Sequence, residues 1–326
     1  MTDQRDGDPA GGRVRTVLGD VPADRLGSDD YHEHLFQVSP LLPGDELDDE
    51  ELSGAEAASL AAAGTGTMVE ATPVGLGADP EAVARISART GLQVVHATGA
   101  HHSGHYLAAD PLLTSSEGEL TARFVGDVED GLRTRAGTRA VGPGGDPVRA
   151  GLVKGAARYW SVDPFGERVL AACAATALRT GVPVMVHLDH GSASHEVLDR
   201  LAAAGVPARR VVLAHMDRNL DPGLHASLVE RGAWLGYDGA ARHREAPDSA
   251  LLECLARTVE AVGPGHVLVG GDVARASRYR AYGGMPGLDY LPARFLPRLR
   301  RELGDEVLHA VTVVNPAAFL GLDPVL

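Results

Sequence analysis

Short runs of β-branched and other apolar residues recur along the chain, and the stretches between them repeat apolar positions with the period of an amphipathic helix. Strands that alternate with helices predict a parallel sheet, and eight such units favour a closed (β/α)8 barrel over an open, doubly wound sheet. We expect the strands at 27–34, 66–71, 93–98, 151–155, 182–188, 210–215, 233–237 and 266–271. We expect helices between most of them at 52–63, 80–90, 167–180, 194–204, 222–231 and 249–262.

One interval of this pattern is longer than the others. The segment 104–149 is expected to contain one helix at 120–132 and a Gly/Pro-rich stretch at 136–147, which we expect to be a long surface loop near the barrel mouth. A barrel of this kind takes about 250 residues and tolerates insertions. No linker divides the chain, so we predict a single α/β TIM-barrel domain over 13–326, preceded by a flexible tail at 1–12.

Composition and charge restrict the partners of the chain. The formal net charge is −14, so we expect the protein to bind neither nucleic acid nor an anionic membrane. The expected partner is a small-molecule substrate. No apolar run reaches the ~18 residues of a membrane span, and 1–12 lacks the apolar segment of a signal peptide. We therefore expect a cytoplasmic protein. Cys173 and Cys254 lie in apolar, helix-like stretches and are expected to be buried free thiols.

Lysine usage is unusual, because Lys154 is the only lysine among 30 basic residues. A bias towards arginine explains the absence of lysine elsewhere but not why one remains. A salt bridge at the barrel mouth is one role for Lys154, although arginine would serve equally well. A Schiff base is another. A third is reaction of the amine with CO₂ to give a carbamate, whose two oxygens can bridge two cations; arginine stays protonated and cannot do this. The histidines at neighbouring strand ends favour the carbamate.

Residues that can bind metal stand at the ends of several expected strands, and the active site of such a barrel lies at the carboxyl ends of its strands. These residues are His32 and His34 after the first run, His187 and His215 after the fifth and sixth, and Asp272 after the eighth. Side chains two apart on a strand face the same way, so the first pair can reach one metal. Imidazole suits zinc and its neighbours, and a metal can partner a buried carboxylate.

Ordinary explanations stay open for each of these residues taken alone. The His-x-His pair also fits a loop coincidence, and His187 and His215 each fit a hydrogen-bonded core histidine. Asp272 also fits the N-cap of a following helix.

The ordered set of candidate ligands resembles the phosphotriesterase-like branch of the amidohydrolase superfamily. Several short motifs extend this resemblance over nearly the whole barrel. They are Tyr-His-Glu-His-Leu at 31–35, Gly-Thr-x-Thr at 64–67, Thr98-Gly99, Ala-His-Met-Asp-Arg-Asn at 214–219, Gly236-Tyr237-Asp238 and Asn315-Pro316.

The resemblance implies a centre with two divalent metal ions, with zinc the expected metal. His32, His34 and Asp272 would hold the more buried ion, and His187 and His215 the more exposed one. Carboxylated Lys154 (N6-carboxylysine) and a hydroxide would bridge the pair. Two cations lower the pKa of bound water, so the bridging hydroxide would attack an ester or lactone while Asp272 takes the proton as the catalytic acid/base. The resemblance also implies a homodimer.

Arginines gather after the last two expected strands, a frequent place for phosphate in such barrels. The pattern Asp-x-Ala-Arg…Tyr-Gly-Gly-x-Pro-Gly resembles family members that open phosphorylated sugar lactones. By that resemblance Arg275 would grip the phosphate, aided by a basic residue near Arg244. Those members usually carry Tyr at position 278 and Lys at 244, where this chain has arginine, which leaves the exact substrate open. The substrate-binding residues we expect are Arg275, Arg244, Arg278, His101 and Tyr282.

Other interpretations of the same residues remain. The arginines also fit a solvated helix face, and His101 and His102 fit ordinary loop histidines. A neutral lactonase, a phosphotriesterase and a hydrolase of small N-acyl amides would share one metal centre. A metal-binding barrel without catalysis is the non-enzymatic alternative.

Overall fold

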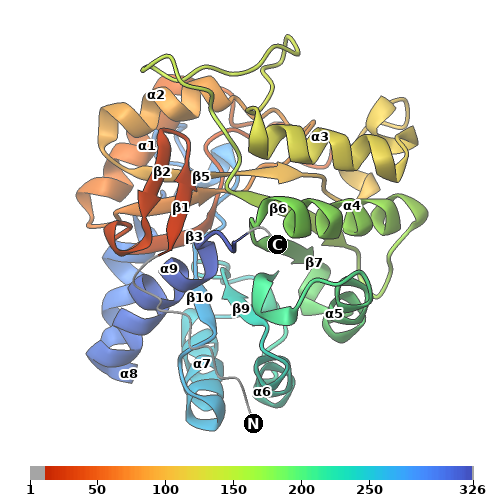
Figure 1. Ribbon diagram of the computed structural model, residues 1–326. Coiled ribbons are helices and arrows are strands. Elements are labelled where there is room, and N and C mark those ends of the chain that lie inside the picture. Colours follow the sequence, from red (N-terminus) through yellow and green to blue (C-terminus); the bar gives the residue numbers. More distant parts are fainter. Residues whose placement is uncertain (1–11, 325–326) are drawn as a thin grey trace.

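The computed structural model describes residues 12–324, so the expected tail at 1–12 lies, apart from Gly12, outside the described residues. Eight parallel strands follow one another around a barrel in chain order, with helices outside them (Figure 1). The strands are β3 (Asp29–Glu33), β4 (Thr67–Glu70), β5 (Gln93–Gly99), β6 (Leu152–Ala157), β7 (Val184–Leu188), β8 (Val211–Ala214), β9 (Trp234–Tyr237) and β10 (Val267–Val269). The predicted (β/α)8 barrel is therefore confirmed.

The last strand returns to the first and makes the ring nearly complete. β10 pairs with β9 on one side, and beyond its end the amide of Asp272 donates to the carbonyl of His32, at 2.9 Å. Strands of such a sheet are covered on both faces, which favours nearly continuous apolar runs. β6 is buried along its whole length even though it contains Lys154. A buried amine in an apolar strand requires a local reason.

Helices surround the strands and begin where the sequence offers a cap. They are α1 (Glu50–Ala62), α2 (Pro80–Thr90), α3 (Glu117–Glu129), α4 (Pro164–Thr180), α5 (Ser194–Ala203), α6 (Pro222–Glu230), α7 (Asp248–Val262), α8 (Leu296–His309) and α9 (Asn315–Leu320). Asp79 caps α2, which has Pro at its first position and ends at Gly91 with φ 75°. These signals explain why the predicted bounds of α2 agree with the structure. Among the described residues, no helix is long and apolar enough to cross a membrane.

A hairpin that we did not predict closes the end of the barrel opposite the strand carboxyl ends. Its strands are β1 (Arg13–Thr16) and β2 (Gly19–Pro22), and Figure 1 shows it with α9 in front of the barrel strands. The amide of Leu322 donates to the carbonyl of Arg13, at 2.9 Å. Apolar side chains from the hairpin, the strands and α9 form a core layer there. Its strands have four residues and expose charged side chains, so the apolar pattern is too short to indicate them.

The long interval differs in two ways from the expectation. α3 begins three residues earlier than predicted, because Ser116 and Glu119 form a capping box. The loop after α3 lies along the flank of the barrel, where Arg135 Nη2 donates to the carbonyl of Gly77 at 3.0 Å. It contributes no residue to the cavity at the barrel mouth described below. The two free cysteines are buried, as predicted.

Candidate metal centre

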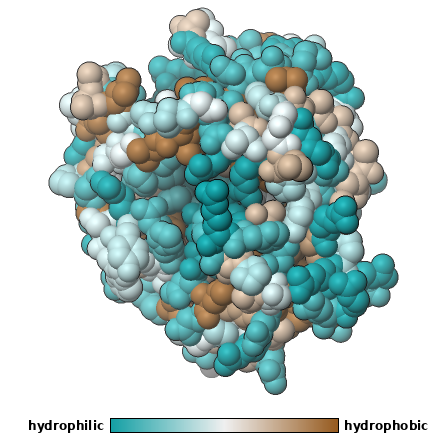
Figure 2. All heavy atoms as spheres, turned by 180° about the vertical axis from the view of Figure 1, so that it is seen from behind, coloured by the Kyte–Doolittle hydropathy of each residue, from teal (hydrophilic) through white to brown (hydrophobic). Residues whose placement is uncertain are grey.

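A cavity of about 370 Å³ opens at the carboxyl ends of the strands. Figure 2 views the molecule from behind Figure 1 and shows hydrophilic side chains around a hollow near the centre of that face. Its walls bring together residues from seven of the eight strand ends or the loops after them. They are His32, His34, Gln37, Leu41, Leu42, His101, His102, His105, Lys154, Arg158, His187, Asp189, His215, Arg218, Arg242, Asp272, Ala274 and Arg275. All six predicted metal ligands are in this set.

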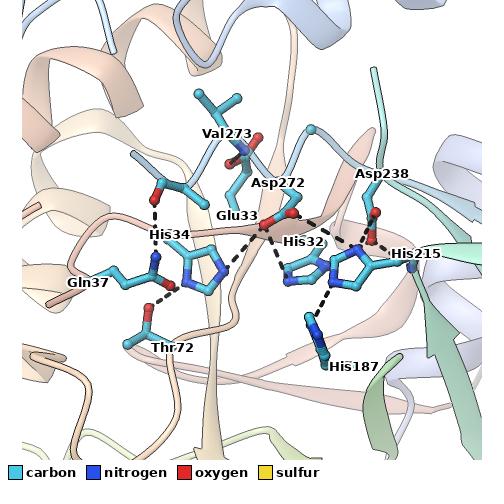
Figure 3. Close-up of polar contacts among 12 residues, drawn as sticks. His32, Glu33, His34, Gln37, Thr72, His187, His215, Asp238, Asp272 and Val273 are labelled. Atoms are coloured by element: carbon cyan, nitrogen blue, oxygen red, sulfur yellow. Dashed lines mark hydrogen bonds and ion pairs between the residues drawn. The ribbon is translucent and has the colours of Figure 1, made fainter. Parts of the chain in front are cut away.

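His32, His34 and Asp272 converge at one point of the wall. The Nε2 atoms of the two histidines lie 3.8 and 3.6 Å from Oδ1 of Asp272, and all three residues are buried (Figure 3). Asp272 holds a positive φ of 41°, which is costly for a residue other than glycine and is typical of functional positions. The backbone thus turns the carboxylate back towards His32 on β3 and His34 just after it.

The other ring nitrogen of each histidine fixes which nitrogen carries a lone pair. Nδ1 of His34 lies 2.6 Å from the hydroxyl of Thr72, which donates its only hydrogen to the carbonyl of Phe36. His34 Nδ1 must therefore carry the hydrogen, and its Nε2 has a bare lone pair. Nδ1 of His32 donates in the same way to Asp238 Oδ2, at 3.0 Å. Two bare nitrogens and a carboxylate oxygen therefore converge, and only the amine of Lys154, 3.3 Å from Nε2 of His32, offers either nitrogen a donor; three such acceptors at one point fit a cation.

Asp238 orients a second metal histidine as well. Its Oδ1 accepts from Nδ1 of His215 at 2.6 Å, while the hydroxyl of Tyr31 and the amide of His215 donate to Oδ2. Burial alone would raise the pKa of this carboxyl, but His215 and His32 hold it well below the usual range. An ionised Asp238 accepts from both rings, so Nε2 of His215 also has a bare lone pair.

His187 and His215 form the second converging pair. Nδ1 of His187 lies 2.8 Å from Nε2 of His215, and the Nε2 of His187 lies 2.8 Å from Asp189 Oδ1. Donation to Asp189 leaves Nδ1 of His187 bare. Two lone pairs then face each other, and a shared cation would remove their repulsion. The donor set therefore fits a second ion at the expected pair.

Lys154 lies between the two groups. Its side chain is 1 % exposed, and Nζ is 3.3 Å from Nε2 of His32. Burial lowers the pKa of this amine to about 8, against the attraction of Asp272 and Asp238. The neutral amine, which is the form that adds CO₂, is therefore a much larger fraction near neutral pH than it would be at the ordinary pKa of lysine. This environment gives a physical basis to the predicted carbamate.

The two oxygens of Asp272 have different neighbours. Oδ1 faces the β3 histidines, whereas Oδ2 pairs with Arg242 and with Arg218, the latter at 2.9 Å. Burial raises the pKa of this carboxyl, but Arg242 and nearby histidines hold it far below its ordinary range. Asp272 is thus ionised and available to a metal. The two guanidinium groups weaken it as a base, a feature that the sequence did not suggest.

The predicted substrate residues occupy three positions relative to the cavity. His101 and Arg275 line the cavity, and Arg278 lies just behind the wall, where Nη1 is 3.4 Å from the carbonyls of Asp272 and Val273. Arg244 is exposed and outside the lining. The hydroxyl of Tyr282 is likewise outside the lining and bonds to Ser53 and Asp49. The structure thus places His101 and Arg275 with the predicted metal ligands in the cavity lining, but not Arg278, Arg244 and Tyr282.

Several residues of the site had no predicted role. Arg218 and Asp238 belong to two motifs that carried the family resemblance, so their presence was visible but their contacts were not. Arg242 lies in the arginine-rich loop after β9, and only the structure shows that it reaches Asp272. Arg158 follows β6 and has no ion pair among residues 12–324. No pattern in the sequence distinguished it from the other arginines.

The sequence and fold of the chain are similar to those of known proteins. A family model described as the phosphotriesterase family matches residues 12–320. The chain belongs to the phosphotriesterase family. The predicted resemblance is thus confirmed, and with it an enzyme of a family of metal-dependent hydrolases acting on lactones or phosphotriesters.

Three known proteins illustrate the similarity of this chain to others. A phospho-furanose lactonase from Mycoplasmopsis agalactiae is 28% identical over 324 residues, which cover 95% of this chain and 92% of the relative. A lactonase structure from Listeria monocytogenes matches with a TM-score of 0.85 and 29% identity, covering 96% of this chain and 100% of that one. A mutant organophosphorus hydrolase from Deinococcus radiodurans matches with a TM-score of 0.79 and 27% identity, covering 96% and 99%.

Proposed function

We propose that the protein is a two-metal lactonase whose substrate is a phosphorylated sugar lactone. The observation that supports this proposal most is which arginines of the cavity wall have close carboxylate partners. Arg218 and Arg242 are engaged with Asp272. Arg158 has no ion pair among the described residues, and the one ion pair that they give Arg275 is long, 3.7 Å to Asp45, with its side chain 44 % exposed. A guanidinium that faces the cavity without a close partner suits an anionic substituent such as phosphate.

The metal centre in this proposal uses the residues that converge in the structure. His32, His34 and Asp272 would hold one ion, His187 and His215 the other, and carboxylated Lys154 would contact both. Zinc is the proposed metal, because the set is dominated by imidazole nitrogens. When bound, the two ions would supply a water of lowered pKa as nucleophile and polarise the carbonyl of the lactone.

The chain's own residues divide the remaining work. Arg275 would position the lactone through its phosphate, at the opening after β10. Asp272 would accept the proton released on attack and pass it to the departing ring oxygen. Its pairing with Arg218 and Arg242 makes the protonated form short-lived, which favours this onward transfer. The similarity to a phospho-furanose lactonase supports the same substrate class.

The test compares phosphorylated lactones with their dephosphorylated counterparts, in a panel that includes neutral lactones, phosphotriesters and N-acyl amides. We expect Arg275→Ala to lower kcat/KM for the phosphorylated lactone by about 10- to 100-fold, since a hydrogen bond to a charged group contributes roughly 1.5–3 kcal/mol. The effect on neutral lactones should be much smaller.

Arg244→Ala is the matched control, because Arg244 is exposed and outside the cavity lining. It should change neither rate. An Arg275→Ala enzyme that hydrolyses every anionic substrate as well as the original would exclude the phosphate assignment. Near-zero bound metal in the active purified protein would exclude the metal centre itself.

A further inference from the structure

A second group of histidines lies in the same cavity, in the loop after β5. The rings of His101 and His105 are 3.7 Å apart, those of His101 and His102 4.5 Å, and His101 is 4.3 Å from the ring of His187. One ring nitrogen from each of His101, His102 and His105 lies within 4.8 Å of the others. By composition alone this group could hold a third metal ion.

Hydrogen bonds to the backbone argue against that role. The amide of His102 donates to Nδ1 of His101 at 2.9 Å, and the amide of Gly104 donates to Nδ1 of His102 at 3.2 Å. A backbone amide can only donate, so each Nδ1 carries the lone pair and the hydrogen of the neutral ring is on Nε2. The lowering of the pKa of both rings by burial agrees with this tautomer. Nε2–H is a hydrogen-bond donor and cannot bind a cation.

A carboxylate lies close to one ring of this pair, that of His102. One ring nitrogen of His102 and one carboxylate oxygen of Asp189 lie within 4.8 Å of each other, beside the metal ligand His187. Asp189 accepts from His187 and from the amide of Tyr159, which leaves lone pairs on a side chain that is 31 % exposed. A group between His102 and Asp189 must therefore accept from one side and donate to the other. A hydroxyl does both, whereas Asp189 would repel a phosphate or carboxylate.

We propose that His101, His102 and Asp189 form a subsite for a hydroxyl group of the substrate, next to the reacting carbonyl. This inference rests on the proposed lactonase function and assigns three residues to a hydroxyl that a sugar lactone carries near its carbonyl. Arg275 follows β10, three strands from β5 around the barrel. The hydroxyl and the phosphate are thus held by separate parts of the wall, which fixes the direction in which the lactone enters.

The experiment measures selectivity between a hydroxylated lactone and its deoxy analogue. A site built around hydrogen bonds rejects an analogue that lacks the hydroxyl, so the original enzyme should prefer the hydroxylated lactone by a factor on the order of 100 or more in kcat/KM. His102→Leu should reduce this preference at least about tenfold. His102→Gln, whose amide can donate from nearly the position of Nε2, should recover part of it. His309→Leu changes an exposed histidine at the end of α8 and should leave the preference unaltered. An unchanged preference in His102→Leu would overturn the subsite.

Metal content and tautomer provide readouts that do not depend on activity. The purified protein should bind two ions per chain, and His102→Leu should bind two as well. ¹⁵N NMR of the metal-loaded protein should show His101 and His102 as neutral rings protonated at Nε2. A third ion that is lost in His102→Leu would overturn the inference and assign the group to metal. If no lactone is hydrolysed, the proposed function fails. The metal content and the NMR spectrum still decide whether His101 and His102 are hydrogen-bond donors or metal ligands.

Discussion

Two groups of histidines share the cavity and have much in common. Both lie at the carboxyl ends of strands, and burial lowers the pKa of histidines in each: His34, His187 and His215 in one group, and His101 and His102 in the other. They differ in the partner of the second ring nitrogen. In the inner group, His32, His34, His187 and His215, that partner is a carboxylate or hydroxyl that accepts. In the rim group, His101 and His102, it is a backbone amide that donates.

This difference assigns opposite roles to one residue type. An accepting partner leaves a lone pair towards the cavity, and a donating partner leaves an N–H. Four lone pairs can bind cations, and two N–H groups can bind substrate oxygens. The residues that decide the role are Asp238, Thr72 and Asp189 on one side and two backbone amides on the other. Changing those partners should therefore affect metal binding in the inner group alone.

The largest effect is expected where the inner group meets Lys154. Lys154→Arg keeps the charge and roughly the size but cannot form a carbamate, so the two proposed ions would lose their shared ligand. We expect kcat/KM to fall about 1000-fold or more, because a bound metal ion stabilises the transition state by several kcal/mol. Metal content should fall below two ions per chain by elemental analysis.

Lys154→Ala is the companion variant. It leaves a space in which acetate or formate can supply the missing carboxylate, so part of the activity should return when either is added. Arginine fills that space, and Lys154→Arg should show no rescue. An active Lys154→Arg enzyme with two bound ions would show that Lys154 serves only as a charge at the barrel mouth.

The next largest effect is expected at Asp238, which holds both His32 and His215. Asparagine can present an amide N–H to one of these rings and turn its lone pair away from the metal. Partners of this kind typically account for 10- to 100-fold in metal affinity, and a charged residue that orients two ligands should lie near ~100-fold. Titration of apoprotein with zinc measures the change. The control is Asp199→Asn, which changes an exposed aspartate and should leave the zinc affinity as in the original protein. An unchanged zinc affinity in Asp238→Asn would show that the tautomers of His32 and His215 do not depend on Asp238.

The sequence predicted what periodicity and strand-end position can encode. The barrel, most helix bounds and the six candidate ligands follow from alternating apolar runs and from the residue that ends each run. α2 was predicted to the residue because Asp79 and Gly91 mark its two ends. The hairpin of β1 and β2 was missed, because its four-residue strands gain their stability from contacts with the distant carboxyl-terminal segment.

Contacts between loops could not be predicted from the sequence, because they too depend on residues far apart in the chain. Whether an arginine faces the substrate or a neighbouring carboxylate depends on backbone turns that periodicity does not describe. Arg242 reaches Asp272, whereas Arg244, two residues later, is exposed. Likewise, His101 and His34 are both strand-end histidines in the sequence. Only their partners, a backbone amide and Thr72, separate a donor from a ligand.

The smallest effect is expected at Thr72, whose hydroxyl accepts from a single neutral ring. Thr72→Val keeps the shape of the side chain but leaves Nδ1–H of His34 without an acceptor, at a cost of about 1 kcal/mol or somewhat more. We expect zinc affinity to fall roughly five- to tenfold, less than in Asp238→Asn, because one ligand loosens and its charge environment is unchanged. Thr176→Val removes an equally buried hydroxyl from α4, far from the cavity, and should bind zinc like the original protein. Equal zinc affinities in the two variants would mean that His34 keeps its lone pair without help from Thr72. The partner of the second ring nitrogen would then decide between metal binding and hydrogen-bond donation only where that partner is a carboxylate.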